Sequence, residues 1–200
     1  FQVFLLFFIL VSYSSVAQNH YPVKINQQWG LMDAEGKIVV QPQYEVIGTP
    51  QAFGYTLMQQ NEQVGLLDNK GNVLIPAIYE EIKILDSNFI SVKELGVQKV
   101  INAQGNAVLS NNNFEKLQVI NSQYLAFSKE GLFGCVNSDG TIILPPAYAT
   151  ITLFQNQFFK VGNGNQYGLS DLKGTLLLSP IADNIAVLEN GLIFYKKGVL

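Results

Sequence analysis

The sequence predicts an all-β fold, an array of about five β-meander or hairpin repeats of 34–35 residues each. Three observations support this class. One motif returns at a constant spacing, each copy contains a hairpin turn, and apolar and polar residues alternate between the turns as they do in strands. Outside residues 1–17, no stretch has the apolar period of an amphipathic helix. Because one such repeat cannot bury its apolar face alone, neighbouring repeats are expected to stack.

Each repeat is centred on a turn in which Asp or Asn comes first and Gly comes fourth. This pattern is typical of a type I turn closed by a left-handed glycine, which joins two antiparallel strands. The Asx side chain accepts hydrogen bonds from backbone N–H groups ahead of it. The turn residues are Asp33, Gly36, Asp68, Gly71, Asn102, Gly105, Asn137, Gly140, Asp171 and Gly174.

Other positions of the repeat recur around this turn. An apolar or aromatic residue and a glycine precede it (Trp29 and Gly30 in the first repeat), and a proline and a tyrosine (Tyr44) follow it. Proline ends strand pairing because it cannot donate a hydrogen bond, and a short strand and a return strand then complete the repeat. The third repeat differs, with Lys99 at the glycine and Phe114 one place after the tyrosine position. The array is expected to be an open solenoid or superhelix, with a ring of small propeller blades as the alternative.

The two ends of the chain carry separate expectations. Residues 1–17 are predicted to be a secretory signal peptide, because the apolar run 4–11 is followed by small residues. No Met or charged segment precedes this run, so the peptide is expected to be incomplete at its start. Residues 18–200 are assigned to the repeat array. Residues 197–200 resemble the start of another repeat, so the array is expected to continue. Without a following repeat, the apolar face at the end of the array would be exposed, and the chain is expected to self-associate end to end.

The composition excludes one class of partner and one kind of cross-link. Net charge is −3, and the 12 Lys and Arg residues form no cluster, whereas nucleic-acid binding requires a basic face. The signal run is too short to span a bilayer, so no membrane span is expected in the mature chain. Cys135 is the only cysteine, so no disulfide can form within the chain, and its place in a predicted strand favours burial.

No residues suggest a catalytic, metal or cofactor site. His20 is the only histidine and is expected on a flexible leader, so a Ser or Cys nucleophile has no base. A zinc site usually needs three or four His, Cys or acidic ligands, which this sequence does not group together. A calcium site needs several carboxylates close together, whereas each turn offers only one Asp, which Asn replaces in two repeats. Glu80 and Glu81 are adjacent, so in a strand they point to opposite faces and cannot form the facing pair of a glycoside hydrolase.

The repeated aromatic residues form the candidate binding face. They are Trp29, Tyr44, Tyr79, Tyr148 and Tyr167. If they are exposed, they make a ladder suited to sugar rings or a peptide, and if they are buried, they belong to the core. Their matched positions in the repeat favour packing.

The segments 29–44, 64–79 and 133–148 resemble the WG repeat, or KWG repeat, family of bacterial proteins. The resemblance extends over roughly residues 20–200. It departs from the family pattern in that tryptophan occurs only in the first repeat and that Lys99 replaces a glycine. The resemblance implies an exported or surface-linked all-β protein without an established catalytic role.

The sequence therefore indicates a non-catalytic exported repeat module that binds or scaffolds a protein or a polysaccharide. Its expected location is the periplasm, the cell surface or the extracellular space. A structural spacer that presents another domain beyond residue 200 is the alternative. A hydrolase is a third hypothesis, and it would require two acidic side chains that face each other in a deep cleft.

Overall fold

The computed structural model describes residues 20–110, 114–187 and 193–196. In this part of the chain all regular structure is β-strand, apart from one short 3-10 helix at Ala52–Gly54. The predicted all-β fold is therefore confirmed, whereas the signal peptide and residues 197–200 lie outside the described residues. The strands are β1 (Tyr21–Ile25), β2 (Gln28–Met32), β3 (Ile38–Tyr44), β4 (Val46–Ile47), β5 (Thr56–Gln60), β6 (Gln63–Leu67), β7 (Val73–Tyr79), β8 (Glu81–Ile84), β9 (Ile90–Glu94), β10 (Val97–Ile101), β11 (Ala107–Leu109), β12 (Lys116–Asn121), β13 (Tyr124–Lys129), β14 (Leu132–Asn137), β15 (Ile142–Tyr148), β16 (Thr150–Phe154), β17 (Phe158–Asn163), β18 (Gln166–Asp171), β19 (Leu176–Ala182), β20 (Asn184–Val187) and β21 (Ile193–Lys196).

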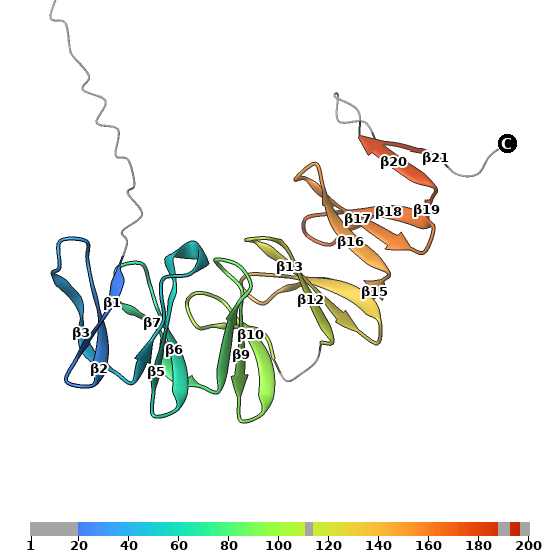
Figure 1. The fold of residues 1–200 in the computed structure, drawn as a ribbon. Helices are drawn as coiled ribbons and strands as arrows, with labels where there is room; N and C mark the ends of the chain where they lie inside the picture. Colours follow the sequence, from blue (N-terminus) through green and yellow to red (C-terminus); the bar gives the residue numbers. More distant parts are fainter. Residues whose placement is uncertain (1–19, 111–113, 188–192, 197–200) are drawn as a thin grey trace, which may run out of the picture.

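The strands pair as antiparallel meanders that follow one another along the chain. The second sheet (β4–β7), the third (β8–β11), the fourth (β12–β15) and the fifth (β16–β19) each have four strands. Among the described residues, the first sheet has three strands (β1–β3) and the sixth has two (β20 and β21). Figure 1 shows these sheets as one curved row whose ends do not meet. The predicted open array is confirmed, and these residues do not close into a ring.

Each sequence repeat is divided between two sheets. In the first repeat the Asx-x-x-Gly turn joins β2 to β3 in the first sheet, whereas the following β4 and β5 pair with β6 and β7 in the second sheet. The sequence analysis groups these four strands as one meander unit, and the structure corrects that grouping. The break falls between Tyr44 and Val46, where β3 ends and β4 begins. Each repeat therefore links two neighbouring sheets covalently.

A second turn also repeats along the chain, and the sequence analysis did not identify it as a repeated feature. It forms the tips of the hairpins β1–β2, β5–β6, β9–β10, β13–β14 and β17–β18. The tip residues are Asn26, Gln27, Asn61, Glu62, Leu95, Gly96, Glu130, Gly131, Gly164 and Asn165. In the first four tips both residues have φ between 50° and 79°, as in type I′ turns. None of these five residue pairs is the Asn-Gly typical of such a turn, so the sequence signal is weak.

The apolar core lies between successive sheets. Between the second and third sheets, Leu66 belongs to one buried cluster with Ile82 and Val92. Between the third and fourth sheets, Val100 belongs to another with Leu125. The strands in the middle of the row therefore bury apolar residues on both faces, one toward the preceding sheet and one toward the next.

Cys135 and His20 are both buried. The Cys135 side chain is fully buried, as expected, and burial raises the pKa of its thiol to about 12. The His20 side chain is only 4% exposed, so the expectation that it lies on a flexible leader is wrong. Its Nε2 atom has no hydrogen-bond partner among the residues that the structure describes.

Candidate binding site

The Asx-x-x-Gly turns share one set of hydrogen bonds. In the first copy, the backbone N–H groups of Glu35 and Lys37 donate to Asp33 Oδ1 at 3.1 and 2.8 Å. In every copy, Oδ1 of the Asx residue accepts the N–H four places later. The other Asx residues are Asp68, Asn102, Asn137 and Asp171. These side chains stabilise the hairpins, and the described residues contain no group of three His, Cys, Asp or Glu that could hold a metal ion.

The glycine before each turn lies where the partner strand bulges toward it. A Cβ atom on Gly134 would lie 2.8 Å from the carbonyl oxygen of Leu144 and 2.9 Å from the nitrogen of Pro146. Phe133 pairs with Tyr148 and Cys135 pairs with Leu144, so two residues along β14 correspond to four residues along β15, which forms a bulge. The glycine and the proline of the motif therefore occur together, because the glycine leaves room for the bulge that contains the proline.

The repeated aromatic residues contribute to the core. Trp29 pairs with Tyr44 across the β2–β3 hairpin. The side chains of Tyr44 and Tyr79 are buried, with 5% and 9% exposed. Trp29, Tyr148 and Tyr167 are half-buried against the clusters between sheets. The five side chains therefore do not form one exposed ladder for a sugar or a peptide.

The third repeat lacks this aromatic pair. Gln98 takes the place of the aromatic residue, and Lys99 takes that of the glycine. β11 ends at Leu109, before the position at which the other repeats have their bulge. Phe114, the expected counterpart of the tyrosine, lies outside the strand ladder. The third sheet is consequently built without the side chains that fill the corresponding space elsewhere in the row.

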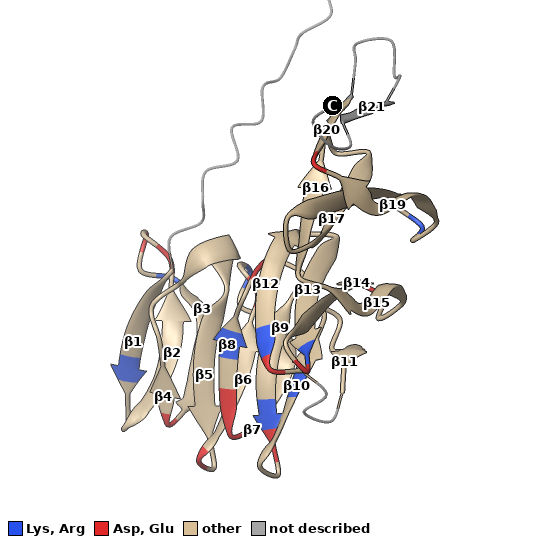
Figure 2. Ribbon diagram, turned by 90° about the vertical axis from the view of Figure 1, so that its right-hand side faces the viewer, with Lys and Arg blue, Asp and Glu red and all other residues tan. Residues whose placement is uncertain are grey.

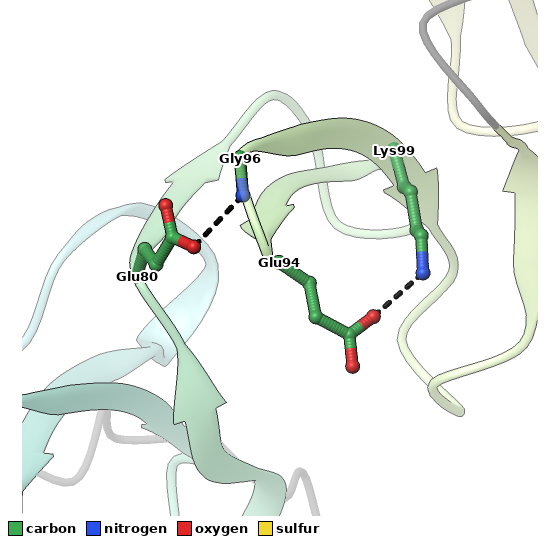
Figure 3. Close-up of polar contacts among 4 residues, drawn as sticks. All are labelled: Glu80, Glu94, Gly96 and Lys99. Carbon is green, nitrogen blue, oxygen red and sulfur yellow. Dashed lines mark hydrogen bonds and ion pairs between the residues drawn. The ribbon is translucent and has the colours of Figure 1, made fainter.

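Two polar contacts hold the hairpin of β9 and β10 in the third sheet (Figure 3). The Nζ atom of Lys99 lies 2.6 Å from Glu94 Oε2, and this hydrogen bond raises the pKa of Lys99. At the hairpin tip, the backbone N–H of Gly96 donates to Glu80 Oε1 at 2.8 Å. The hairpin is therefore fixed at its tip and along its length.

A polar pocket opens on the face of this hairpin that points toward the fourth sheet. It consists of two adjoining hollows that share Lys83, Ser91 and Gln98. The first hollow, of about 260 Å³, is also bounded by Glu81 and Lys93. The second, of about 200 Å³, is also lined by Leu85, Phe114, Glu115 and Leu117. We call these two hollows together the third-sheet pocket.

The register of the strands brings the polar residues of this pocket together. Lys83 lies directly opposite Ser91 in the β8–β9 ladder, and Gln98 lies opposite Lys93 in the β9–β10 ladder. Alternate residues of a strand share a face, so all four side chains lie on the same side of the sheet. The Nε2 atom of Gln98 donates to Ser91 Oγ at 3.0 Å. Ser91 itself is buried, so its hydroxyl lies at the base of the pocket.

The charges around the pocket are mixed. β8, β9 and β10 each carry one lysine, and Figure 2 shows basic positions gathered on the third sheet. Lys93 Nζ lies 3.6 Å from Glu80 Oε2, and Lys99 is paired with Glu94. Lys83 makes no hydrogen bond or ion pair within the described part of the chain. Its ammonium group is therefore the one cation of these three strands without such a partner in the described structure.

The sequence analysis did not select the residues of this pocket. It noted that the third repeat departs from the pattern at Lys99, but it followed the repeated aromatic residues instead. The usable signal was a polar residue, Gln98, at a position that is apolar or aromatic in the other repeats, together with alternating polar residues in the neighbouring strands. A broken repeat marks a place where the common packing is absent.

The described residues contain no helix that could cross a membrane. A search of curated proteins finds no match. Among solved structures, Hsv2 of Kluyveromyces lactis is similar with a TM-score of 0.34 and 16% identity, over 80% of this chain and 60% of that chain. The same protein with loop 6CD replaced by a Gly-Ser linker has a TM-score of 0.36 and 14% identity, over 81% of this chain and 62% of that chain. A eukaryotic initiation factor has a TM-score of 0.42 and 16% identity, over 84% of this chain and 55% of that chain. The chain thus spans less than two thirds of each of these structures.

The family comparison agrees with the repeat seen in the sequence and in the sheets. The profile of the WG containing repeat matches residues 29–62, 65–96, 133–167 and 167–198. These segments include more than half of the chain and skip most of the third repeat, where Gln98 and Lys99 depart from the motif. The chain therefore belongs to the WG containing repeat family.

Proposed function

We propose that this chain is an exported, non-catalytic repeat module that binds a partner, a protein or a polysaccharide, through the third-sheet pocket. One observation carries the proposal: the pocket forms at the repeat in which a polar residue, Gln98, replaces the apolar or aromatic residue before the turn. The other repeats fill the same space with apolar side chains, as Trp29 and Tyr44 do in the first. A pocket with a few convergent polar groups is the usual form of a binding site.

The rest of the array supports the role of a rigid carrier for this pocket. Each repeat continues from one sheet into the next, so the sheets are joined covalently as well as by their buried clusters. Two hydrogen bonds also connect the third and fourth sheets. Asn88 Nδ2 donates to the Ser122 carbonyl at 2.9 Å, and Asn102 Nδ2 donates to the Ser138 carbonyl at 3.0 Å.

A binding screen with a filled pocket tests this proposal. The chain would be applied to glycan and peptide arrays beside the variants Gln98→Trp and Gln63→Trp. Gln98→Trp places an aromatic side chain where the first repeat has Trp29, whereas Gln63 is an exposed residue of the neighbouring second sheet. We expect the wild type and Gln63→Trp to bind the same array component and Gln98→Trp to lose it. Equal binding by all three folded proteins, or no binding by the wild type, would overturn the proposal.

Export is part of the proposal and rests on residues 1–17. A reporter that is active only outside the cytoplasm, fused after residue 200, tests it in a bacterial host. We expect reporter activity with the natural leader and its loss when charged residues interrupt the apolar run 4–11. Activity that is independent of the leader would contradict export by this route.

A further inference from the structure

We infer that the ligand of the third-sheet pocket is an acidic sugar, a saccharide unit that carries one carboxylate, and that Lys83 binds this carboxylate. The inference rests on the proposed function, because it assumes that the pocket is the binding site. It goes further by naming the ligand class and the role of each side chain. Four features of the pocket support it.

The first feature is the ammonium group of Lys83. The other two lysines of β8–β10 are ion-paired with glutamates, whereas Lys83 has no such partner in the described part of the structure. Its side chain lines both hollows of the pocket. Charge-assisted hydrogen bonds from an ammonium group to a carboxylate are about twice as strong as neutral ones. A carboxylate is therefore the group that this position binds best.

The second feature is a hydroxyl donor beside this cation. Ser91 lies directly opposite Lys83, and such cross-strand neighbours have Cβ atoms roughly 5 Å apart. Ser91 Oγ already accepts a hydrogen bond from Gln98 Nε2. A hydroxyl group has one donor and two acceptor sites, so Ser91 can still donate its proton to a ligand oxygen. Lys83 and Ser91 thus offer two adjacent donors to one carboxylate.

The third feature is an apolar wall next to these donors. Leu85, Phe114 and Leu117 line the second hollow, and all three are half-buried against the core cluster between the third and fourth sheets. A pyranose ring has C–H groups on its faces and hydroxyl groups at its edge, which suits a site with one apolar wall and a few polar groups. Hollows of about 260 and 200 Å³ have room for single sugar rings.

The fourth feature is the sign of the charges at the rim. Glu81 borders the first hollow and Glu115 the second, so carboxylates lie near the lysines. The two oxygens of Glu115 already accept the backbone N–H groups of Glu130 and Gly131 at 2.9 and 3.1 Å. Glu81 can accept hydrogen bonds from sugar hydroxyls, and both carboxylates repel a ligand that carries many negative charges. The rim therefore favours a sugar with one carboxylate over a polyphosphate or a nucleic acid.

Calorimetric titration of the full chain with the methyl glycoside of galacturonate and with its methyl ester tests the inference. The ester differs from the acid by the loss of its single negative charge. We expect the wild type to bind the acid at least about tenfold more tightly than the ester, as one charge-assisted hydrogen bond predicts. Lys83→Gln should lower the affinity for the acid by a similar factor and leave that for the ester unchanged. Lys83→Arg should retain binding, and Lys70→Gln, an exposed turn lysine, is the matched control.

Three results would overturn the inference. They are equal affinity for acid and ester, unchanged affinity in folded Lys83→Gln, and tighter binding of a short peptide with a free C-terminal carboxylate. A neutral glycan that binds the wild type and is lost in Gln98→Trp would overturn the acidic-sugar inference and leave the proposed function standing. Failure of both experiments would remove the pocket as a binding site.

Discussion

Gln98 donates a hydrogen bond from Nε2 to Ser91 Oγ at 3.0 Å, and it does so from the position that Trp29 occupies in the first repeat. Trp29 packs against the core between two sheets, whereas Gln98 is exposed and lines a pocket. One substitution within the motif thus replaces an apolar contact by a polar one. The third repeat keeps its turn and its strands but loses the packing that the motif otherwise brings.

The motif glycine is expected to tolerate no side chain. In Gly134→Ala the new Cβ would meet the backbone of β15 at under 3 Å, so β15 must shift, and we expect a loss of roughly 1–3 kcal/mol in the free energy of unfolding. Urea unfolding followed by fluorescence measures this loss. The matched control is Gly131→Asn at the tip of the same hairpin, where space is open and Asn accepts the positive φ. Equal losses in the two variants would contradict the proposed role of the bulge.

Glu80 is expected to stabilise the tip of the β9–β10 hairpin. Glu80→Ala removes the acceptor for the Gly96 N–H, which should cost about 0.5–1.5 kcal/mol and speed hydrogen exchange at that amide. The exposed contact between Glu80 and Lys93 should add little. Amide exchange measured by NMR checks the prediction, with Glu81→Ala as the control. The same exchange rate for Gly96 in both variants would argue against this bond.

The turn carboxylate of Asp171 should make stability depend on acid pH. The backbone N–H of Thr175 donates to it and holds its pKa below the ordinary value of 3.8, although partial burial opposes the shift. A lowered pKa in the folded state means stability that is present above the unfolded pKa and is lost as the pH falls through the folded pKa.

The variant Asp171→Asn isolates this effect. The amide oxygen can accept the same bonds, as Asn102 does, but it does not titrate. We expect the wild type to lose stability relative to the variant as the pH is lowered from about 6 to about 2.5, so that the denaturation midpoint of the wild type minus that of the variant falls. The other carboxylates cancel in this difference. A difference that stays constant over the range would refute the linkage.

Cys135 is expected to be inert in the folded chain. Its thiol is fully buried and its pKa is raised to about 12, so very little thiolate exists at pH values near 8. Ellman's reagent should therefore react with the native protein only through unfolding, at a rate that rises with urea. The urea-unfolded chain is the positive control. Rapid stoichiometric reaction without denaturant would show that the fourth sheet opens locally.

Much of the fold could be predicted because its signals are local. Each Asx-x-x-Gly turn is closed by hydrogen bonds within five residues, so Asp33 and Gly36 predict a hairpin whatever the rest of the chain contains. Five copies at one spacing then predict a stacked array. Type I′ tips such as Leu95-Gly96 are also local, but their residue types are so varied that the series was overlooked.

The candidate site was harder to predict because it depends on residues that are distant in sequence. Phe114 and Leu117 reach the pocket from the next sheet, and Lys83, Ser91 and Gln98 come from three different strands. The aromatic residues gave the stronger sequence signal, yet the burial of Tyr44 and Tyr79 is decided by the neighbouring sheets.

The strands, the Asx-x-x-Gly turns and the period of this protein follow from the local sequence, since these depend on backbone geometry and hydrogen bonds within a few residues. The tertiary structure alone decided which sheet each strand joins, because β4 pairs with β5 and not with β3 once the chain passes Tyr44. It also decided that the space beside Gln98 stays open. Strand pairing and packing between sheets are non-local, so their outcome depends on side chains that only folding brings together.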